Sequence, residues 1–279
     1  MAHRTGDNLL ILCLFFLLLL VPLEVSAEVY VDMYGGAVFT NKTDLTVSST
    51  SGTTTTNQGL SVADTWTVGG RTGYWLDRFD WLGFGLDVFF FRVNAPGQLV
   101  PSTVTNAGQS TTTLAPAQWS LPVFGIGFDV LRLRIPLLRN DAYPHGRLQP
   151  FVSAGPSLFI TYAGTPTNVQ PQNQHDTDVA VGAKVDAGIT FLLTKNIGLF
   201  TQYRFTHFTS ELSYQNSVTG FSTDSYRTTF DSPHVIGGLS LVGDHGGCDE
   251  YAAQLAAHPF NFHNHTGQDR IGRSTVESP

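Results

Sequence analysis

The chain has few cysteines, few charged residues and, after residue 21, no long apolar run. Only Cys13 and Cys248 are cysteines, and Cys13 lies in a leader that we expect to be removed, so no intramolecular disulfide can stabilise the rest. Charged residues make up only 13% of the chain, with 22 acids against 15 bases for a net charge of −7. No basic stripe is present, which argues against a nucleic-acid partner.

The first 27 residues have the pattern of a secretory signal peptide. A weakly basic opening precedes an unbroken apolar run over 9–21, and small residues follow at 25–27. We predict cleavage after Ala27, because the run is shorter than the ~20 residues that a membrane anchor usually needs. Cleavage removes one base and two acids, so the net charge of −7 becomes −6. No later stretch could form a spanning helix, and membrane insertion would therefore require a β-barrel.

A period-two pattern runs without a slip over 178–191. Every odd position from Val179 to Phe191 is apolar, whereas Asp178, Lys184 and Asp186 lie on the opposite face. This pattern predicts a strand. Soluble strands average ~5 to 6 residues, and this one is long enough to cross a bilayer when tilted by about 45°. Its apolar face would contact lipid and its charged face a lumen.

Seven further segments show the same pattern. We predict an eight-stranded antiparallel up-and-down transmembrane β-barrel over 28–243, with a flexible tail over 244–279. An even strand number returns the chain to its starting side, as bacterial barrels require. The predicted strands are 28–40, 64–76, 82–93, 118–130, 147–162, 178–193, 197–214 and 229–242.

The connections alternate between short and long. Segments 77–81 and 194–196 are short, as periplasmic turns are, and 131–146 is somewhat longer. The other four connections are polar, and 41–63 has eleven Ser or Thr among its 23 residues. We expect these four to be mobile extracellular loops that contact a ligand or surface, on a monomer embedded in outer-membrane lipids. They are 41–63, 94–117, 163–177 and 215–228.

Charged residues within the strands have the parity of the lumen. Pairing Leu76 with Leu82 across the first short turn places Arg71 opposite Asp87, and pairing Leu193 with Ile197 places Asp186 opposite Arg204. An eight-stranded barrel is just wide enough to be filled by side chains, so we predict a salt-bridged plug. The predicted lumen charge network is Asp32, Arg71, Asp87, Asp129, Lys184, Asp186, Arg204 and His234.

Aromatic residues cluster near the ends of the predicted strands. Tyr74, Trp75, Phe79 and Trp81 lie at the first short turn. A second group lies towards the long connections, and two such levels would form interfacial girdles. The second group is Trp66, Phe89 to Phe91, Trp119, Phe159 and Tyr162. The alternative interpretation is that these are core aromatics of a soluble β-sandwich, although a sandwich rarely needs so many long strands.

With these features, the chain resembles small outer-membrane barrels of the OmpA transmembrane-domain and opacity-protein kind. The stretches 148–156, 196–205 and 234–241 carry this resemblance, which covers roughly 28–243. It implies a surface-exposed, non-enzymatic barrel in the bacterial outer membrane with a structural, adhesive or host-facing role. The last strand departs from the family, because it ends at Leu241-Val-Gly243 without a terminal aromatic residue.

Three other functions remain open. The tail contains four histidines and Cys248, which are metal-ligand types, but their spacing fits no compact site. A lipid-modifying enzyme could use His207, Ser210 and Glu211, although Ser210 has the opposite parity to the other two. A narrow solute channel would need a gap among the lumen charges. We predict no catalytic residue, no metal ligand and no cofactor.

Overall fold

The computed structural model describes residues 27–164, 175–216 and 222–244. All of them belong to the first of two compact units, Met1–Asp244, and the second unit is His245–Pro279. The predicted signal peptide, apart from Ala27, and nearly all of the predicted tail, with Cys248 and the tail histidines, lie outside the described residues. No helix among the described residues is long and apolar enough to cross a membrane.

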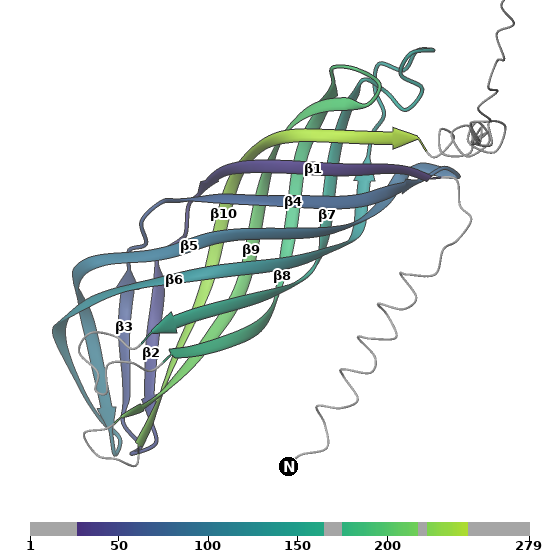
Figure 1. The fold of residues 1–279 in the computed structure, drawn as a ribbon. Coiled ribbons are helices and arrows are strands. Elements are labelled where there is room, and N and C mark those ends of the chain that lie inside the picture. The colour runs from purple at the N-terminus through teal and green to yellow at the C-terminus, as the bar shows by residue number, and fades with distance from the viewer. Residues whose placement is uncertain (1–26, 165–174, 217–221, 245–279) are drawn as a thin grey trace, which may run out of the picture. The chain divides into compact units, whose positions relative to one another are not determined.

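Eight long strands form a closed antiparallel barrel (Figure 1). Consecutive long strands pair with one another, and β1 closes the ring by pairing with both β4 and β10. The predicted all-β, up-and-down fold is therefore confirmed. The long strands are β1 (Ala27–Val38), β4 (Thr65–Leu76), β5 (Phe79–Asn106), β6 (Gln109–Arg134), β7 (Leu148–Gly164), β8 (His175–Leu192), β9 (Ile197–Asn216) and β10 (Ser222–Asp244).

Two shorter strands, β2 (Thr43–Ser49) and β3 (Thr54–Leu60), form a hairpin beyond the end of β1. There β2 pairs with β10 and β3 pairs with β5, so the hairpin takes the place in the sheet that β1 and β4 leave. Together with the adjoining parts of β5, β6 and β10, at 94–106, 109–121 and 222–228, it forms what we call the extension (Figure 1).

The extension corrects the prediction of mobile loops at 41–63 and 94–117. Residues 94–117 continue β5 and β6 through a two-residue turn at Ala107 and Gly108, whose φ values of 47° and 82° suit a twisted hairpin. Thr and Ser favour strands and bond across them, as Thr103 and Thr112 do at 3.0 Å. No alternating apolar pattern marks these strands, because polar residues occupy both faces near the tip.

The predicted loops at 163–177 and 215–228 are also shorter than expected. Strand β7 continues to Gly164 and β8 starts at His175, while β9 ends at Asn216 and β10 starts at Ser222. The remaining residues of both connections, 165–174 and 217–221, lie outside the described residues.

Register shifts, or β-bulges, change which residues share a face. In β4, Leu76 pairs with Phe79 instead of Leu82, and the predicted register begins one pair later, at Trp75 and Gly83. In β6 a register shift lies between Gly127 and Leu131, so that Val130 and Leu131 are both exposed. An extra residue in one strand reverses the parity of all residues beyond it.

Candidate functional site: the barrel lumen

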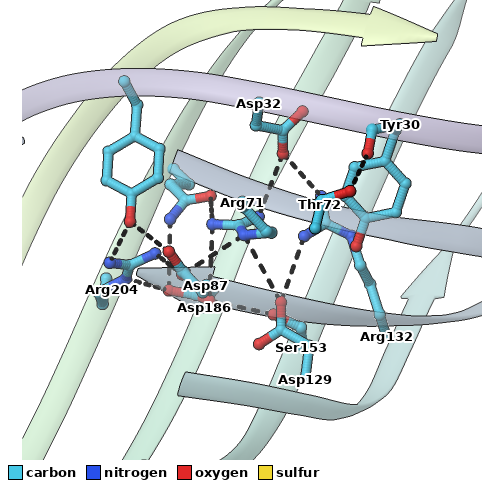
Figure 2. A network of polar contacts seen from close by, with 12 residues as sticks. Tyr30, Asp32, Arg71, Thr72, Asp87, Asp129, Arg132, Ser153, Asp186 and Arg204 are labelled. Carbon is cyan, nitrogen blue, oxygen red and sulfur yellow. Dashed lines mark hydrogen bonds and ion pairs between the residues drawn. The ribbon is translucent and has the colours of Figure 1, made fainter. Parts of the chain in front are cut away.

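Eight charged side chains meet inside the barrel, and each is at most 3% exposed. Four are carboxylates and four are cations, so their formal charges cancel. Strands β1, β4, β5, β6, β8 and β9 supply them. We call this group the lumen charge cluster, most of which is drawn in Figure 2. Its members are Asp32, Arg71, Asp87, Asp129, Arg132, Lys184, Asp186 and Arg204.

Lys184 reaches from β8 to three carboxylates. Its Nζ atom lies 2.6 Å from Asp87, 2.7 Å from Asp129 and 3.1 Å from Asp186. The side chain passes Gly127 on β6, where an added Cβ would lie only 2.8 Å from the Lys184 Cε atom. A glycine in the facing strand therefore provides the room for this lysine to cross the lumen.

Arg204 on β9 lies opposite Asp186 on β8, and its Nε donates to the Asp186 Oδ1 atom at 2.8 Å. Its other nitrogens contact Asp87 and donate to the Tyr34 hydroxyl at 2.9 Å. The Tyr34 hydroxyl in turn donates to Asp87. Arg204 thus links two carboxylates that come from strands far apart in the barrel (Figure 2).

Arg71 on β4 lies opposite Asp87 on β5, with its Nε 3.4 Å from the Asp87 Oδ2 atom. It also lies 3.6 Å from both Asp32 and Asp129. Gln202 accepts a bond of 2.8 Å from the Arg71 Nη2 atom. Each cation therefore contacts more than one carboxylate, which is how buried ions offset the free energy of leaving water.

Sequence reasoning missed Arg132, which lies 3.5 Å from Asp129 and 3.7 Å from Asp32. Its guanidinium also lies over the rings of Tyr30 and Phe151, at 4.6 Å and 4.5 Å from their centroids. The predicted strand ended at residue 130, and the bulge before Arg132 reverses parity. Two adjacent apolar residues, Val130 and Leu131, followed by alternating arginines, were the signal for that bulge.

A second buried ion pair near the short turns was also missed. Arg134 donates to both oxygens of Glu28, each at 2.7 Å, and to the Asp80 carbonyl at 2.6 Å. Its guanidinium lies 4.4 Å from the centroid of Trp75. Both side chains are buried, Glu28 at 4% and Arg134 at 2% exposed. With this pair, the described residues outside the extension bury five carboxylates and five Lys or Arg side chains, so their formal charges still cancel.

On the other side of the cluster, towards the extension, large aromatic side chains line the lumen together with small polar ones. Phe159 and Phe208 stack with centroids 4.1 Å apart, and Phe91 packs against Phe208. His234, predicted to join the charge network, borders both this layer and the lumen charge cluster. It is fully buried, packs on Phe91 and contacts Thr206 through Nε2 at 3.2 Å. In the pairing of β9 with β10, His234 is the cross-strand partner of Arg204.

This aromatic layer corrects the predicted girdle. Phe89, Phe91 and Phe159 are at most 1% exposed and fill the lumen, because they have inward parity. Trp66 and Tyr162 are 60% and 48% exposed and do face outward. At the short turns, Phe79 and Trp81 are exposed whereas Trp75 is buried. The girdle is therefore sparser than the aromatic content suggested.

The outside of the barrel is apolar on every long strand. Exposed residues include Met33 on β1, Val68 on β4 and Phe124 on β6, and β8 alone exposes five. We call this surface the apolar belt. On strands β5, β7, β8, β9 and β10, in that order, examples of its exposed residues are Val88, Val152, Val181, Tyr203 and Val235.

The candidate catalytic trio is not assembled. His207 is 54% exposed on the outer face, where its Nδ1 lies 2.6 Å from Asp231. Glu211 is also exposed and accepts from Ser225 at 2.8 Å. Ser210 is buried on the opposite face and bonds to Thr161 at 2.8 Å. No group of three potential metal ligands comes together in the part of the chain that the structure describes.

No protein-family model and no curated protein sequence matches this chain. Solved structures do resemble it. The outer membrane protein OprG from Pseudomonas aeruginosa has 10% identity and a TM-score of 0.47 over 79% of this chain and 97% of that one. Neisserial surface protein A has 13% identity and a TM-score of 0.39 over 76% and 96% of the two chains.

The outer membrane protease OmpT from Escherichia coli is similar at 9% identity and a TM-score of 0.39, over 77% of this chain and 97% of that one. These likenesses concern the fold alone, and the more specific OmpA or opacity type stays a prediction.

Proposed function

We propose that the chain is an integral outer-membrane β-barrel, closed to solutes, that acts at the cell surface through its extension. The observation that carries this proposal is the inversion of a soluble fold, with an apolar exterior around a balanced and buried charge cluster. In water this apolar exterior would be exposed to solvent, which is unfavourable, and soluble monomers rarely present large contiguous apolar surfaces. Contact with lipid removes the unfavourable free energy of exposing it to water.

The height of the apolar belt suits a bilayer. On β8 the exposed apolar residues run from Val179 to Phe191. Twelve steps of ~3.3 Å, tilted by about 45°, span roughly 28 Å along the membrane normal. The apolar band of outer-membrane barrels is about 25 Å tall, so the length of the belt matches this class.

The lumen charge cluster supports a closed barrel. Its members contact one another directly, and the aromatic layer fills the lumen beside it. A solute would have to break several buried ion pairs, and leaving one buried partner unpaired costs about 3–5 kcal/mol. A closed lumen leaves the extension as the part that contacts other molecules.

Membrane fractionation tests the location. We expect the protein in the outer-membrane fraction, with a mature chain that begins at Glu28 by mass spectrometry. Its folded form should migrate differently from the boiled form on a gel, as closed barrels do. Recovery as a soluble periplasmic protein would contradict the proposal.

Conductance in planar bilayers tests the closed lumen. The wild-type barrel should show no stable current steps. Arg204→Ala leaves Asp87 and Asp186 without one of their cations, so it should either produce current steps or lower the unfolding midpoint. Arg92→Ala is the matched control, because Arg92 lies on the exposed face of β5. An Arg204→Ala barrel with wild-type conductance and stability would refute the plug.

A further inference from the structure

Strand β6 has an edge that no described residue pairs with. On one side β6 pairs with β5 from Gln109 onwards, but its pairing with β7 begins only at Val123 and Thr161 (Figure 1). The second edge of 109–122 is therefore without a backbone partner among the described residues. Such an edge presents N–H and C=O groups to any strand that can align with it.

This edge lacks the usual protection against pairing. Residues 109–122 contain no charged residue, and the first proline is Pro116. The run 109–115 (Gln-Ser-Thr-Thr-Thr-Leu-Ala) keeps a regular register with β5 and is rich in β-favouring threonine. Exposed edges are normally blunted by charges, bulges or prolines. Seven regular, neutral residues form a surface suited to strand addition.

The charge of the molecule favours a second copy of the chain as the partner that pairs with this β6 edge. After the predicted cleavage the chain carries a net charge of −6, so two copies repel one another overall. The edge at 109–115 is neutral, and two identical edges meet without like-charge repulsion. Leu114 within the edge and Leu99 on the neighbouring strand are 69% and 68% exposed on one face of the β5–β6 hairpin, where a second copy would cover more apolar surface.

Membrane geometry decides how two copies can pair. Two barrels in one membrane point in the same direction, so their β6 strands cannot run antiparallel. Barrels in two facing membranes point towards each other, and their β6 strands then run in opposite directions. A symmetric antiparallel pair centred on Thr112 places Thr111 opposite Thr113 of the other copy.

We propose that the β6 edge at 109–115 pairs antiparallel with the same edge of a second copy on a facing cell, so that the protein mediates contact between cells that carry it. This inference rests on the proposed outer-membrane location and names the partner of the extension. Hydrogen bonds between the two backbones would hold the copies together. The neutral threonine surface would make a second copy of this chain the preferred partner.

Cell settling tests the proposal. Cells that display the wild-type protein should clump and settle several-fold faster than cells without it. Thr112→Lys places two like charges opposite each other at the centre of the pair, so clumping should be lost. Thr112→Glu cells should also fail to clump alone, but a mixture of Thr112→Lys and Thr112→Glu cells should clump. Val104→Lys is the control, because it adds the same charge one strand away from the edge.

Fractionating the same cells separates a failure of this inference from a failure of the proposed function. Absence from the outer membrane defeats both this inference and the proposed function. A folded outer-membrane protein whose cells do not clump defeats this inference alone. It also fails if differently labelled cells lacking the protein join the clumps equally, since the partner is then another molecule. Persistent clumping of Thr112→Lys cells would exclude the β6 edge.

Discussion

Lys184 is the residue on which the lumen charge cluster depends most. Its Nζ atom lies within 3.1 Å of three carboxylates. Without it, four buried acids face three cations. The other cations are arginines that already contact two or more partners, so none is free to take its place. The cost of removing Lys184 should therefore resemble that of breaking a buried ion pair.

Lys184→Met should lower the free energy of unfolding by about 3–5 kcal/mol, because methionine fills similar space but leaves three buried carboxylates without one of their cations and the cluster with an excess negative charge. Urea unfolding of the barrel in lipid vesicles measures this. Lys195→Met, at the exposed turn before β9, should have little effect. Adding Asp129→Asn to Lys184→Met should restore part of the loss. An unchanged midpoint for Lys184→Met would show that the carboxylates do not need this cation.

At this scale, the sequence could predict cross-strand partners but not three-dimensional neighbours. The period-two pattern and a short turn were enough to place Arg71 opposite Asp87 and Asp186 opposite Arg204. The contacts of Lys184 with β5 and β6 cross the lumen, and no local pattern encodes them. Arg132 escaped because a bulge reversed its parity, and a bulge leaves only a faint sequence signal.

At the scale of elements, the pairing of β8 with β9 ends before either strand does. The last pair is Ala183 with His207, although β9 continues to Asn216. Beyond that pair, side chains of β8, and not its backbone, accept hydrogen bonds from the backbone of β9. Asp178 accepts from the Glu211 amide at 2.9 Å, and Asp176 accepts from the Ser213 amide at 2.6 Å. This seam depends on two carboxylates instead of a ladder of backbone bonds.

Asp178→Ala should loosen the seam locally without unfolding the barrel. Losing a hydrogen bond to a charged acceptor costs about 1.5 kcal/mol, which corresponds to roughly tenfold faster amide exchange at Glu211. Hydrogen exchange followed by mass spectrometry measures this. Asp64→Ala, an exposed acid at the same end of the barrel, should leave exchange at Glu211 unchanged. If exchange at Glu211 does not change in Asp178→Ala either, the carboxylate does not hold the seam.

The eight long strands were predictable because one apolar face alternates with a lumen face along each. Strands β2 and β3 were not, since nearly half of their segment 41–63 is Ser or Thr and no apolar face alternates there. Their strand structure comes from pairing with β10 and β5, which is a tertiary effect that overrides weak local preference. The apolar layer around Phe208 was missed for a different reason. Its inward-facing aromatic residues are neighbours in sequence of outward-facing ones, and only the strand register shows which of them point into the lumen.

At the scale of the whole molecule, exposed apolar residues occur in two settings that sequence alone does not distinguish. Val185 is 50% exposed near the middle of the apolar belt on β8. Leu99 is 68% exposed in the extension, and the polar outward residues Arg92 and Asn94 separate it from the belt. If the belt lies in lipid and the extension in water, the same substitution must have different effects at these two sites.

Val185→Arg should destabilise the inserted barrel by about 2–4 kcal/mol, the cost of an arginine on the lipid face near the bilayer midplane. Leu99→Arg should change stability by less than about 0.5 kcal/mol, as exposed substitutions in water usually do. Unfolding of both variants in lipid vesicles measures the difference, and outer-membrane yield gives an independent readout. Equal changes in the free energy of unfolding at the two sites would mean that the apolar belt does not face lipid, because an exposed arginine in water has a similarly small effect at either site.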